Sequence, residues 1–334
     1  MNASLRLPVA DASQAGEARR LASAWMRGRG WGEQLEGTVA LVVTELGRNL
    51  ALHTRGGELL LRNLSHAADH GVEILSLDSG PGVENFSECM RDGHSTAGTA
   101  GIGLGAVQRA SSLFEVFSRP GIGTALLCQL WAKPPGVSAE KFEAGAAAVA
   151  LAGQEVSGDT WAAQFESSER ARLILADGLG HGELAADASQ KAVQVFSEGA
   201  RWSLVELMQR IHEALRSTRG AAVAVAEIDP AKGRVSYVGL GNISASIVTA
   251  GKSVSLVSHN GTAGGQYRTI QEFTYSWTAG AFLVMHSDGI KTQWQLERYT
   301  GLGQRHPGLV AGVLYRDFHR PNDDSTVVVM RARP

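Results

Sequence analysis

Apolar residues recur at helical spacing up to residue 53, after which the pattern changes to short strands separated by turns. Spacings of three and four predict one helix over 12–29 and a second over 33–53. Short apolar segments then predict strands, at 58–63, 72–77, 114–118 and 124–131. A further helix is expected at 104–112, directly after a glycine-rich loop. The mixture predicts an α+β domain over 1–133.

A polar, proline-rich segment, AKPPGVSAE, interrupts this pattern and marks a domain boundary. We take 134–141 as the linker and 142–334 as a second domain. Its expected strands lie at 143–152, 170–176, 221–228, 234–239, 244–249, 253–257, 271–277, 282–287 and 326–331. Two helices are predicted, at 183–198 and 203–218. Strands around a helical pair favour a layered sandwich over a doubly wound sheet.

Length, charge and cysteine usage narrow the class of protein. A chain of 334 residues is long for a single core and favours two domains. The net charge of −2 comes without a Lys/Arg stripe, so we expect no nucleic-acid partner. We also expect no membrane partner, because no apolar run reaches the ~18–20 residues of a membrane span. Cys89 and Cys128 fit neither a disulfide framework nor a zinc spacing, and with no signal peptide they indicate a cytoplasmic protein.

The first half carries polar residues suited to a nucleotide and its metal. Glu45 and Asn49 lie four apart, so both project from one face of the second predicted helix, where their oxygens could serve Mg²⁺. Asp78 ends an apolar strand and is followed by Ser-Gly-Pro-Gly. A carboxylate there can accept a hydrogen bond from an exocyclic amine such as that of adenine. Taken singly, the helical pair fits a solvated face and the aspartate an ordinary turn.

Four glycines, Gly98, Gly101, Gly103 and Gly105, precede a predicted helix. Backbone N–H groups of such a loop, together with the helix N-terminus, face any anion placed there. GIGLGA superficially matches a dinucleotide-binding fingerprint. The residues before it, NFSECMRDGHSTAG, do not form a strand pattern, which argues against a Rossmann unit.

Aspartates at strand ends are the candidate chemistry of the second half. Asp177 and Asp288 follow apolar strands and Asp323 precedes one, while Asp159 in SGDTW is a fourth candidate. Oxygen ligands suit Mg²⁺ or Mn²⁺ better than zinc. Two such cations a few ångströms apart would activate a phosphoryl group for hydrolysis. Each Asp-Gly pair alone is a common turn, and it is their repetition at strand ends that indicates a metal site.

The short motifs of the first half resemble those of the GHKL ATPase superfamily, in the same order, over residues 5–131. Glu45/Asn49, DSGPG, GIGLG and GIGT (Gly121–Thr124) match its boxes, and MRDGHST followed by AGTAGIGLGAVQRASSLFEV resembles RsbT-type switch kinases and their anti-sigma relatives. The resemblance implies an ATP-binding α/β sandwich with Asn49 on Mg²⁺, Asp78 on adenine and Glu45 as general base. It further assigns nucleotide contacts, to Gly80, Gly82, Gly101, Gly103, Gly105 and Thr124.

The second half resembles the PPM-type phosphatases of the SpoIIE and RsbX branch over residues 142–333. SGD, ADGLGHG, SDG and DDST match its metal motifs in order. The resemblance implies an αββα sandwich and metal ligands at Asp159, Asp177, the Gly178 carbonyl, Asp288 and Asp323, with Asp324 the less favoured of its pair. SGDTWAAQF lacks the second acidic residue found after SGD in many relatives, as in the compact RsbX subgroup. His181 could donate to phosphate or support its turn.

Together the two resemblances imply a bifunctional regulator of a partner-switching pathway. One domain would use ATP and Mg²⁺ to phosphorylate a serine or threonine of a STAS-type protein. The other would use Mg²⁺ or Mn²⁺ to dephosphorylate a phosphoserine or phosphothreonine partner. The alternative is a first domain that binds ATP and a STAS protein or a sigma factor, without transferring phosphate, and regulates an active phosphatase.

Overall fold

The structure, a computed structural model, describes residues 3–66, 69–84, 86, 103–133, 141–166, 169–249 and 252–333. The chain divides into two units, one of Ser4–Ser138 and one built mainly from Ala139–Pro334. The predicted linker, 134–141, lies outside the described residues except for Lys141. None of the helices in these ranges combines the length and apolarity that crossing a bilayer needs.

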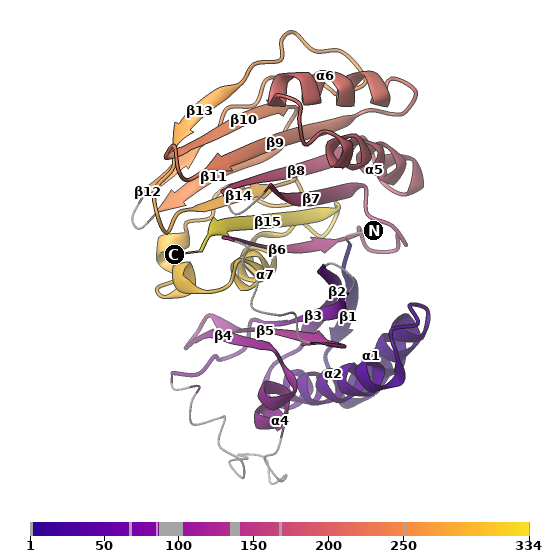
Figure 1. The fold of residues 1–334 in the computed structure, drawn as a ribbon. Helices are drawn as coiled ribbons and strands as arrows, with labels where there is room; N and C mark the ends of the chain where they lie inside the picture. Colours follow the sequence, from indigo (N-terminus) through magenta and orange to yellow (C-terminus); the bar gives the residue numbers. More distant parts are fainter. Residues whose placement is uncertain are drawn as a thin grey trace. The chain divides into compact units, whose positions relative to one another are not determined.

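The first unit is a five-stranded sheet with helices on one face (Figure 1). The strands are β1 (Leu5–Val9), β2 (Gly57–His66), β3 (Asp69–Asp78), β4 (Leu113–Arg119) and β5 (Gly123–Trp131). They lie in the order β1-β2-β3-β5-β4, and each described pair is antiparallel. The helices are α1 (Ala12–Arg27), α2 (Glu33–His53) and α4 (Gly103–Ala110). The antiparallel pairing agrees with the sequence-based argument against a Rossmann unit.

The helices of the first unit form where the apolar spacing predicts them. Asp11 caps α1, because its side chain accepts a hydrogen bond from the backbone N–H of Gln14 at 2.9 Å. The buried face of α2 packs on alternate residues of the central strands. The shared core includes Val39, Val42, Leu46, Leu59, Leu61, Val72, Ile74 and Leu126. Helix α4 adds Val107 to the same core and contacts α2.

The second unit contains two five-stranded sheets. The first has the order β13-β10-β9-β8-β7, formed by β13 (Phe273–Ser276), β10 (Arg234–Leu240), β9 (Ala221–Asp229), β8 (Arg170–Gly178) and β7 (Asp159–Glu166). The second has the order β12-β11-β14-β15-β6, formed by β12 (Lys252–Ser255), β11 (Ser244–Thr249), β14 (Phe282–His286), β15 (Ser325–Ala332) and β6 (Phe142–Val149). One apolar core, which includes Leu173, Leu175, Tyr237, Leu283 and Val328, joins their facing sides.

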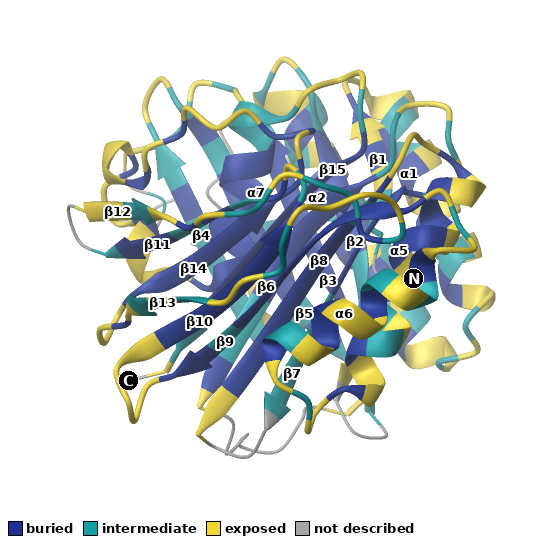
Figure 2. Cartoon of the chain, turned by 90° about the horizontal axis from the view of Figure 1, so that it is seen from above, coloured by how far each residue is buried: buried dark blue, intermediate teal, exposed yellow. Residues whose placement is uncertain are grey.

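Helices cover the outer faces of both sheets in this unit (Figure 1). The pair α5 (Glu183–Glu198) and α6 (Leu204–Leu215) packs on the first sheet through a second core with Phe196, Leu207 and Ile211. Figure 2 shows the resulting pattern, with dark-blue strands and helices such as α6 that are buried on one side only. Helix α7 (Pro307–Phe318) contacts β6 and β15. The predicted αββα sandwich, and with it the two-domain α+β fold, is therefore confirmed.

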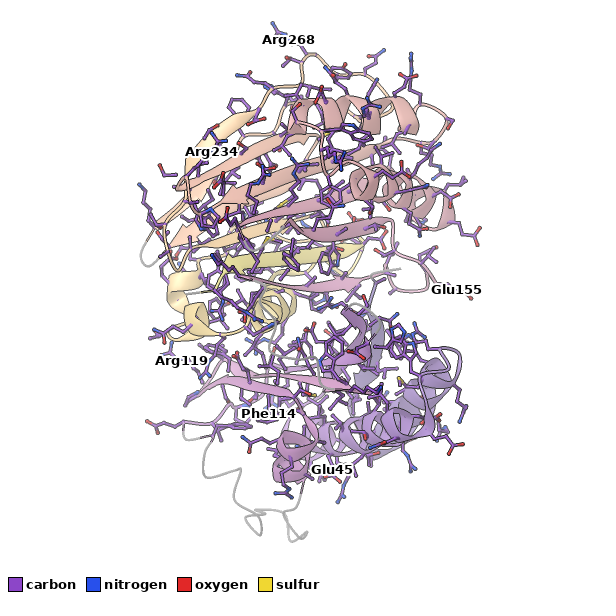
Figure 3. The ribbon with its side chains drawn as sticks, viewed as in Figure 1. Glu45, Phe114, Arg119, Glu155, Arg234 and Arg268 are labelled. Carbon is purple, nitrogen blue, oxygen red and sulfur yellow. The ribbon has the colours of Figure 1, made fainter. Side chains whose placement is uncertain are left out.

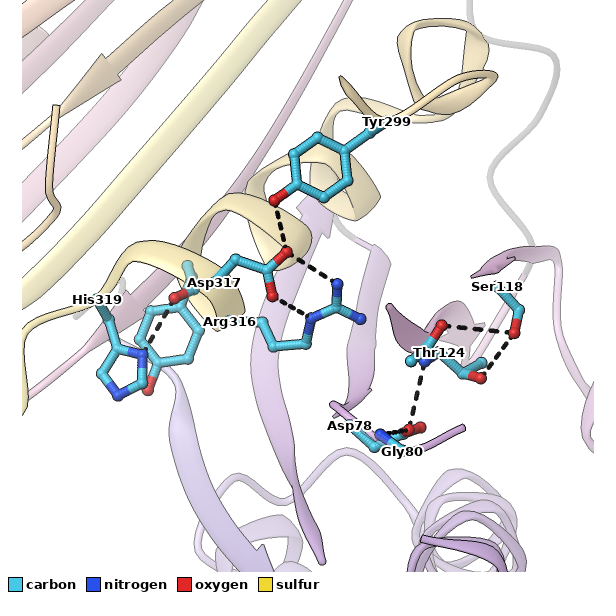
Figure 4. A network of polar contacts seen from close by, with 10 residues as sticks. Asp78, Gly80, Ser118, Thr124, Tyr299, Arg316, Asp317 and His319 are labelled. Carbon is cyan, nitrogen blue, oxygen red and sulfur yellow. Dashed lines mark hydrogen bonds and ion pairs between the residues drawn. The ribbon is translucent and has the colours of Figure 1, made fainter. Parts of the chain in front are cut away.

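The segment before α7 contains two short 3-10 helices, η1 (Leu296–Arg298) and η2 (Leu302–Gln304), and is tied to α7 by polar contacts. The hydroxyl of Tyr299 donates to Asp317 at 2.7 Å (Figure 4). Arg316 holds the same carboxylate through Nε at 2.7 Å and a terminal nitrogen at 2.9 Å. This network anchors residues 296–304 to the C-terminal end of α7.

Strands β1 and β7 and helix α7 were not predicted from the sequence, nor were the two short 3-10 helices. Strand β1 is only five residues long, and β7 begins at the candidate ligand Asp159, where no strand was predicted. Helix α7 (PGLVAGVLYRDF) is buried from Pro307 to Tyr315 without interruption, so its sequence shows no polar face to mark a helical period. The other predicted helices and strands are confirmed within a few residues at their ends.

Candidate metal centre and nucleotide site

The strand register of the second unit brings the candidate aspartates to one edge of the sandwich. Asp159, at the start of β7, pairs directly with Asp177 near the end of β8. Asp288 lies two residues beyond β14, and Asp323 lies two residues before β15, which pairs with β14. The hydroxyl of Ser287 donates to Asp159 at 2.6 Å and thereby joins the two sheets at this edge. The sandwich thus assembles four carboxylates that are far apart in sequence.

Asp159 is the most deeply buried of the four, with 4% of its surface exposed. One oxygen, Oδ2, accepts from Ser287, whose hydroxyl in turn accepts from the backbone N–H of Thr326 at 3.1 Å. The other, Oδ1, is buried and accepts no hydrogen bond of good geometry from the residues that the structure describes, although the hydroxyl of Thr326 is close enough to lower the pKa of the carboxyl. Burial raises the pKa of Asp159 to about 7, although the hydrogen bond from Ser287 acts in the opposite direction. A buried carboxylate oxygen with no donor is a ready ligand for a cation.

Asp177 shows how burial and acidic neighbours act together on a carboxyl group of this edge. Burial is the main cause that raises its pKa to about 9, and the charges of its acidic neighbours add to it. Those neighbours are Asp159, Asp288, Asp323 and Asp324. The pKa of Asp323 is also raised, first by burial and then by Asp288. Carboxylates arranged in this way favour either protons or cations at neutral pH.

Neighbouring side chains distinguish the roles of the remaining aspartates. Asn242, in the turn after β10, donates to Asp288 Oδ2 at 2.7 Å and orients that carboxylate. Both oxygens of Asp324 accept backbone hydrogen bonds, from Leu151 at 2.8 Å and Gly158 at 3.0 Å. Asp324 is 3% exposed, and it ties the loop before β7 to the start of β15. These bonds favour a structural role for Asp324 and leave Asp323 as the better ligand candidate.

The donor set of this edge fits divalent cations of the Mg²⁺ or Mn²⁺ class, because it consists of carboxylate oxygens with one unpartnered buried atom. Among the described residues, no three acidic, histidine or cysteine side chains already stand in the geometry of a chelate. Binding would therefore involve side-chain rotation. Gly178 lies in this cluster, and a Cβ there would lie 2.0 Å from the carbonyl oxygen of Ala185, so only glycine allows the close approach of α5.

The two histidines near this edge differ in character. His286 is 2% exposed, and its Nε2 accepts from the indole N–H of Trp294 at 3.2 Å. Burial lowers its pKa, so it remains a neutral core residue, as its apolar strand predicts. His181 is exposed in the turn before α5. The sequence did not identify Ser287 and Asn242 as partners of the aspartates. Ser287 is marked only by its position next to Asp288, and Asn242 only by a Gly-Asn pair typical of a turn.

In the first unit, Asp78 closes a small polar network at the end of β3. Its Oδ1 accepts from the backbone N–H of Gly80 at 2.7 Å and of Thr124 at 3.3 Å (Figure 4). The hydroxyl of Thr124 lies 2.8 Å from that of Ser118, which accepts from the backbone N–H of Val83 at 2.9 Å. The predicted Asp78, Gly80 and Thr124 therefore lie together at one site.

Close backbone approaches explain the glycines of this network. A Cβ on Gly82, which has φ +65°, would lie 2.0 Å from the carbonyl oxygen of Arg119. Gly123 has φ +98°, and a Cβ there would lie 2.2 Å from the carbonyl oxygen of Asp78. Only glycine tolerates these dihedrals and contacts together. The turn of DSGPG and the GIGT turn are thus packed directly against each other.

Glu45 and Asn49 lie on α2, where both are partly buried. The Glu45 carboxylate reaches the N-terminus of α4 (Figure 3), because a Cβ on Gly103 would lie 2.6 Å from Glu45 Oε2. Asn49 forms no side-chain hydrogen bond with any described residue. Gly105 is buried within α4. Gly101, like Gly98 and Cys89, lies outside the described residues.

Comparison with known proteins agrees with the division of the chain into two units. The family model for stage II sporulation protein E (SpoIIE) matches residues 167–333, half of the chain. The model for the histidine kinase-like ATPase domain matches residues 9–129. Serine/threonine-protein kinase RsbT of Bacillus subtilis is 30% identical over 114 residues, which is 34% of this chain and 86% of RsbT. Phosphoserine phosphatase RsbX of the same organism is 24% identical over 141 residues, which is 41% of this chain and 69% of RsbX.

A solved structure supports the fold of the second unit. The crystal structure of RsbX in complex with magnesium aligns with a TM-score of 0.51 and 18% identity, over 57% of this chain and 95% of RsbX. At that identity the match bears on the fold alone. The sequence match to SpoIIE, the relationship to RsbT and the αββα sandwich with its aspartate edge lead to one conclusion. The chain belongs to the SpoIIE family of PPM-type serine/threonine phosphatases and carries ahead of that domain a histidine kinase-like ATPase domain related to RsbT.

Proposed function

We propose that this chain both removes and adds phosphate in a partner-switching pathway. The second domain, 142–334, would dephosphorylate a phosphoserine or phosphothreonine protein. The first domain, 1–133, would transfer phosphate from ATP to a serine or threonine of a STAS-type protein, with 134–141 as the linker between them. The relatives RsbT and RsbX support this pairing, since one is a serine/threonine-protein kinase and the other a phosphoserine phosphatase.

One observation carries the phosphatase half: acidic side chains crowd around Asp159 and Asp177, and Asp159 Oδ1 is buried without a hydrogen-bond partner among the described residues. Asp159, Asp177, Asp288 and Asp323, with the Gly178 carbonyl, would hold Mg²⁺ or Mn²⁺. When bound, such cations supply Lewis acidity that polarises a phosphoryl oxygen. The protein's own contribution is to fix the ligands: Ser287 holds Asp159 and Asn242 holds Asp288. Titration of the protein with each cation measures whether Mn²⁺ or Mg²⁺ binds more tightly.

A pair of ligand variants tests the phosphatase. Asp177→Ala and Asp288→Ala should each abolish the Mn²⁺-dependent release of phosphate from a phosphoserine protein, because each removes a ligand from the shared site. Asp187→Ala is the matched control, since Asp187 is an exposed aspartate on α5. Full activity in both ligand variants would contradict the metal-site assignment.

The kinase half rests on the Asp78 network and on the position of Glu45 beside α4. Asp78 would recognise adenine, Asn49 would bind Mg²⁺, and the glycine-rich residues up to Gly105 would cover the phosphates. Glu45 would then be placed to accept the proton of the attacking hydroxyl. No described residue bonds the Asn49 side chain, so its amide is available to a ligand.

Radiolabelled ATP distinguishes a kinase from a binding module. With a STAS-domain protein and ATP labelled on the γ-phosphate, the chain should label the partner, and Asn49→Ala or Asp78→Ala should prevent labelling. Gln34→Ala, an exposed position on α2, is the control. A stable ATP-dependent complex without transfer of label would instead show a first domain that binds the STAS protein, or a sigma factor, and regulates the phosphatase.

A further inference from the structure

The loop between β8 and α5, together with the first turn of α5, exposes two apolar side chains beside the candidate metal edge. Seven large hydrophobic side chains are exposed among the described residues, and two of them, Leu179 (46%) and Leu184 (55%), lie within the six residues 179–184. Single exposed leucines are ordinary on protein surfaces. Two that flank the loop directly after Asp177 are placed where a macromolecular substrate must approach the carboxylates.

A guanidinium lies over the same loop. The backbone N–H of Leu179 donates to the carbonyl oxygen of Gly220 at 3.0 Å, which fixes the loop beside the start of β9. Arg219 is the residue before Gly220, and its Nη1 lies 3.0 Å from where a Cβ on Gly180 would stand. Since Gly180 has no side chain, the guanidinium occupies that space. Arg219 lies two residues before Ala221, which pairs with Gly178 in the adjacent strand. Because Gly178 follows Asp177, this register places Arg219 near the candidate metal edge.

Arg219 is exposed and makes no hydrogen bond or ion pair with the described residues. Other arginines of this unit are engaged: Arg172 pairs with Glu227 at 2.6 Å, and Arg216 pairs with Glu213 at 3.3 Å. A guanidinium binds a phosphate dianion through two parallel hydrogen bonds. At the rim of an acidic site, such a group would also offset the repulsion between an anionic substrate and the carboxylates.

We propose that Arg219, Leu179 and Leu184 form the substrate-recognition rim of the phosphatase site. Arg219 binds the phosphate of a phosphoserine or phosphothreonine, and the two leucines contact an apolar side chain next to that residue in the substrate protein. This proposal rests on the phosphatase function proposed above and adds a substrate class to it: a phosphorylated segment with apolar flanks. Charge complementarity selects the phosphate, and the paired leucines select its neighbour.

Binding of inorganic phosphate to the Mg²⁺-loaded full chain tests Arg219 without turnover. In isothermal titration calorimetry, Arg219→Ala should weaken phosphate binding about 10- to 100-fold, the loss expected for a charge-assisted hydrogen bond. Arg219→Lys should lie between Arg219→Ala and wild type, because it keeps the charge but not the fork. Arg216→Ala, three residues earlier in the chain and already paired with Glu213, should bind as wild type. Equal affinity in Arg219→Ala and wild type would overturn the assignment.

A pair of peptides tests the leucines. Both carry a non-hydrolysable phosphonate analogue of phosphoserine and differ only in the flanking residue, leucine or serine. By fluorescence anisotropy, wild type should prefer the leucine peptide by about 3- to 10-fold. A Leu179→Ser/Leu184→Ser double variant should bring this ratio towards one, while Leu21→Ser, 47% exposed on α1, should keep it. Absence of a preference in wild type, or an unchanged ratio in the double variant, would contradict the proposal.

These binding measurements separate the rim from the activity. If wild type hydrolyses no phosphoserine protein, the proposed function fails, yet the phosphate and peptide affinities still decide whether the rim exists. If wild type is active while Arg219→Ala and the double variant bind as wild type, the phosphatase function stands and the rim is wrong.

Discussion

Ser287 illustrates how much of the candidate metal edge depends on residues other than the proposed ligands. Its hydroxyl donates to Asp159 and accepts from the backbone N–H of Thr326, in a position with no exposure to solvent. Ser287→Ala removes both bonds and leaves buried polar groups unpaired, so it should destabilise the fold by about 1–3 kcal/mol. Calorimetric unfolding measures this loss, and Ser253→Ala on exposed β12 is the control. Equal stability of the two variants would contradict the role of Ser287.

The raised pKa values predict how stability depends on pH in the metal-free protein. Asp159 and Asp177 have pKa values of about 7 and about 9 when folded, against 3.8 for a free aspartate. Between pH 4 and 9 the folded state therefore binds more protons than the unfolded state, and stability falls as pH rises. Metal-free protein should melt at a lower temperature at pH 8 than at pH 5, and Mg²⁺ should raise the melting temperature most at pH 8.

A charge-removing variant isolates the contribution of this cluster to the pH dependence. Asp177→Asn cannot lose a proton, so the melting temperature of the metal-free variant should fall less between pH 5 and pH 8 than that of wild type. Differential scanning calorimetry of both proteins measures the difference. Parallel curves for the two proteins would contradict the raised pKa of Asp177.

At the residue scale, sequence indicated the acidic side chains but not what holds them. Asp177, Asp288 and Asp323 stand out because each adjoins an apolar strand, a pattern visible without a structure. Asn242 lies 46 positions from Asp288, the carboxylate to which it donates. Such partners become visible only when the strand register is known.

Among the elements, α7 depends on two facing glycines. A Cβ on Gly145 of β6 would lie 2.2 Å from the backbone nitrogen of Gly308 in the first turn of α7. Gly145→Ala should therefore push the helix away from the sheet and cost about 1–3 kcal/mol of stability, as overpacking does. Thermal unfolding tests this, with Gly303→Ala as the control, because nothing lies within 4 Å of a Cβ at Gly303. A melting temperature equal to wild type would contradict this packing.

The same element shows why prediction of the fold from sequence is uneven. Helices α2 and α5 have one apolar face and one polar face, and their ends were predicted at the residues observed. Helix α7 is buried all round, so its apolar residues carry no period. Strand β7 (DTWAAQFE) alternates only weakly, and its place in the sheet comes from pairing with the strongly apolar β8.

For the whole molecule, the central proposal is that one polypeptide both phosphorylates and dephosphorylates proteins. The matches to an ATPase domain and to a phosphatase domain on one chain support that claim. If both activities acted continuously on the same residue of one target protein, ATP would be consumed without any change in how much of that protein is phosphorylated. Two different target proteins, or reciprocal control of the two domains, are therefore the expected arrangement.

The most direct test follows phosphate in both directions with the full chain. Wild type, Asn49→Ala and Asp177→Ala are each given γ-labelled ATP with a STAS-domain protein, and separately a phosphoserine protein with Mn²⁺. We predict that Asn49→Ala loses labelling but still releases phosphate, and that Asp177→Ala loses release but still labels. If no variant differs from wild type in either reaction, or if wild type fails to perform one of the two reactions, the account is contradicted.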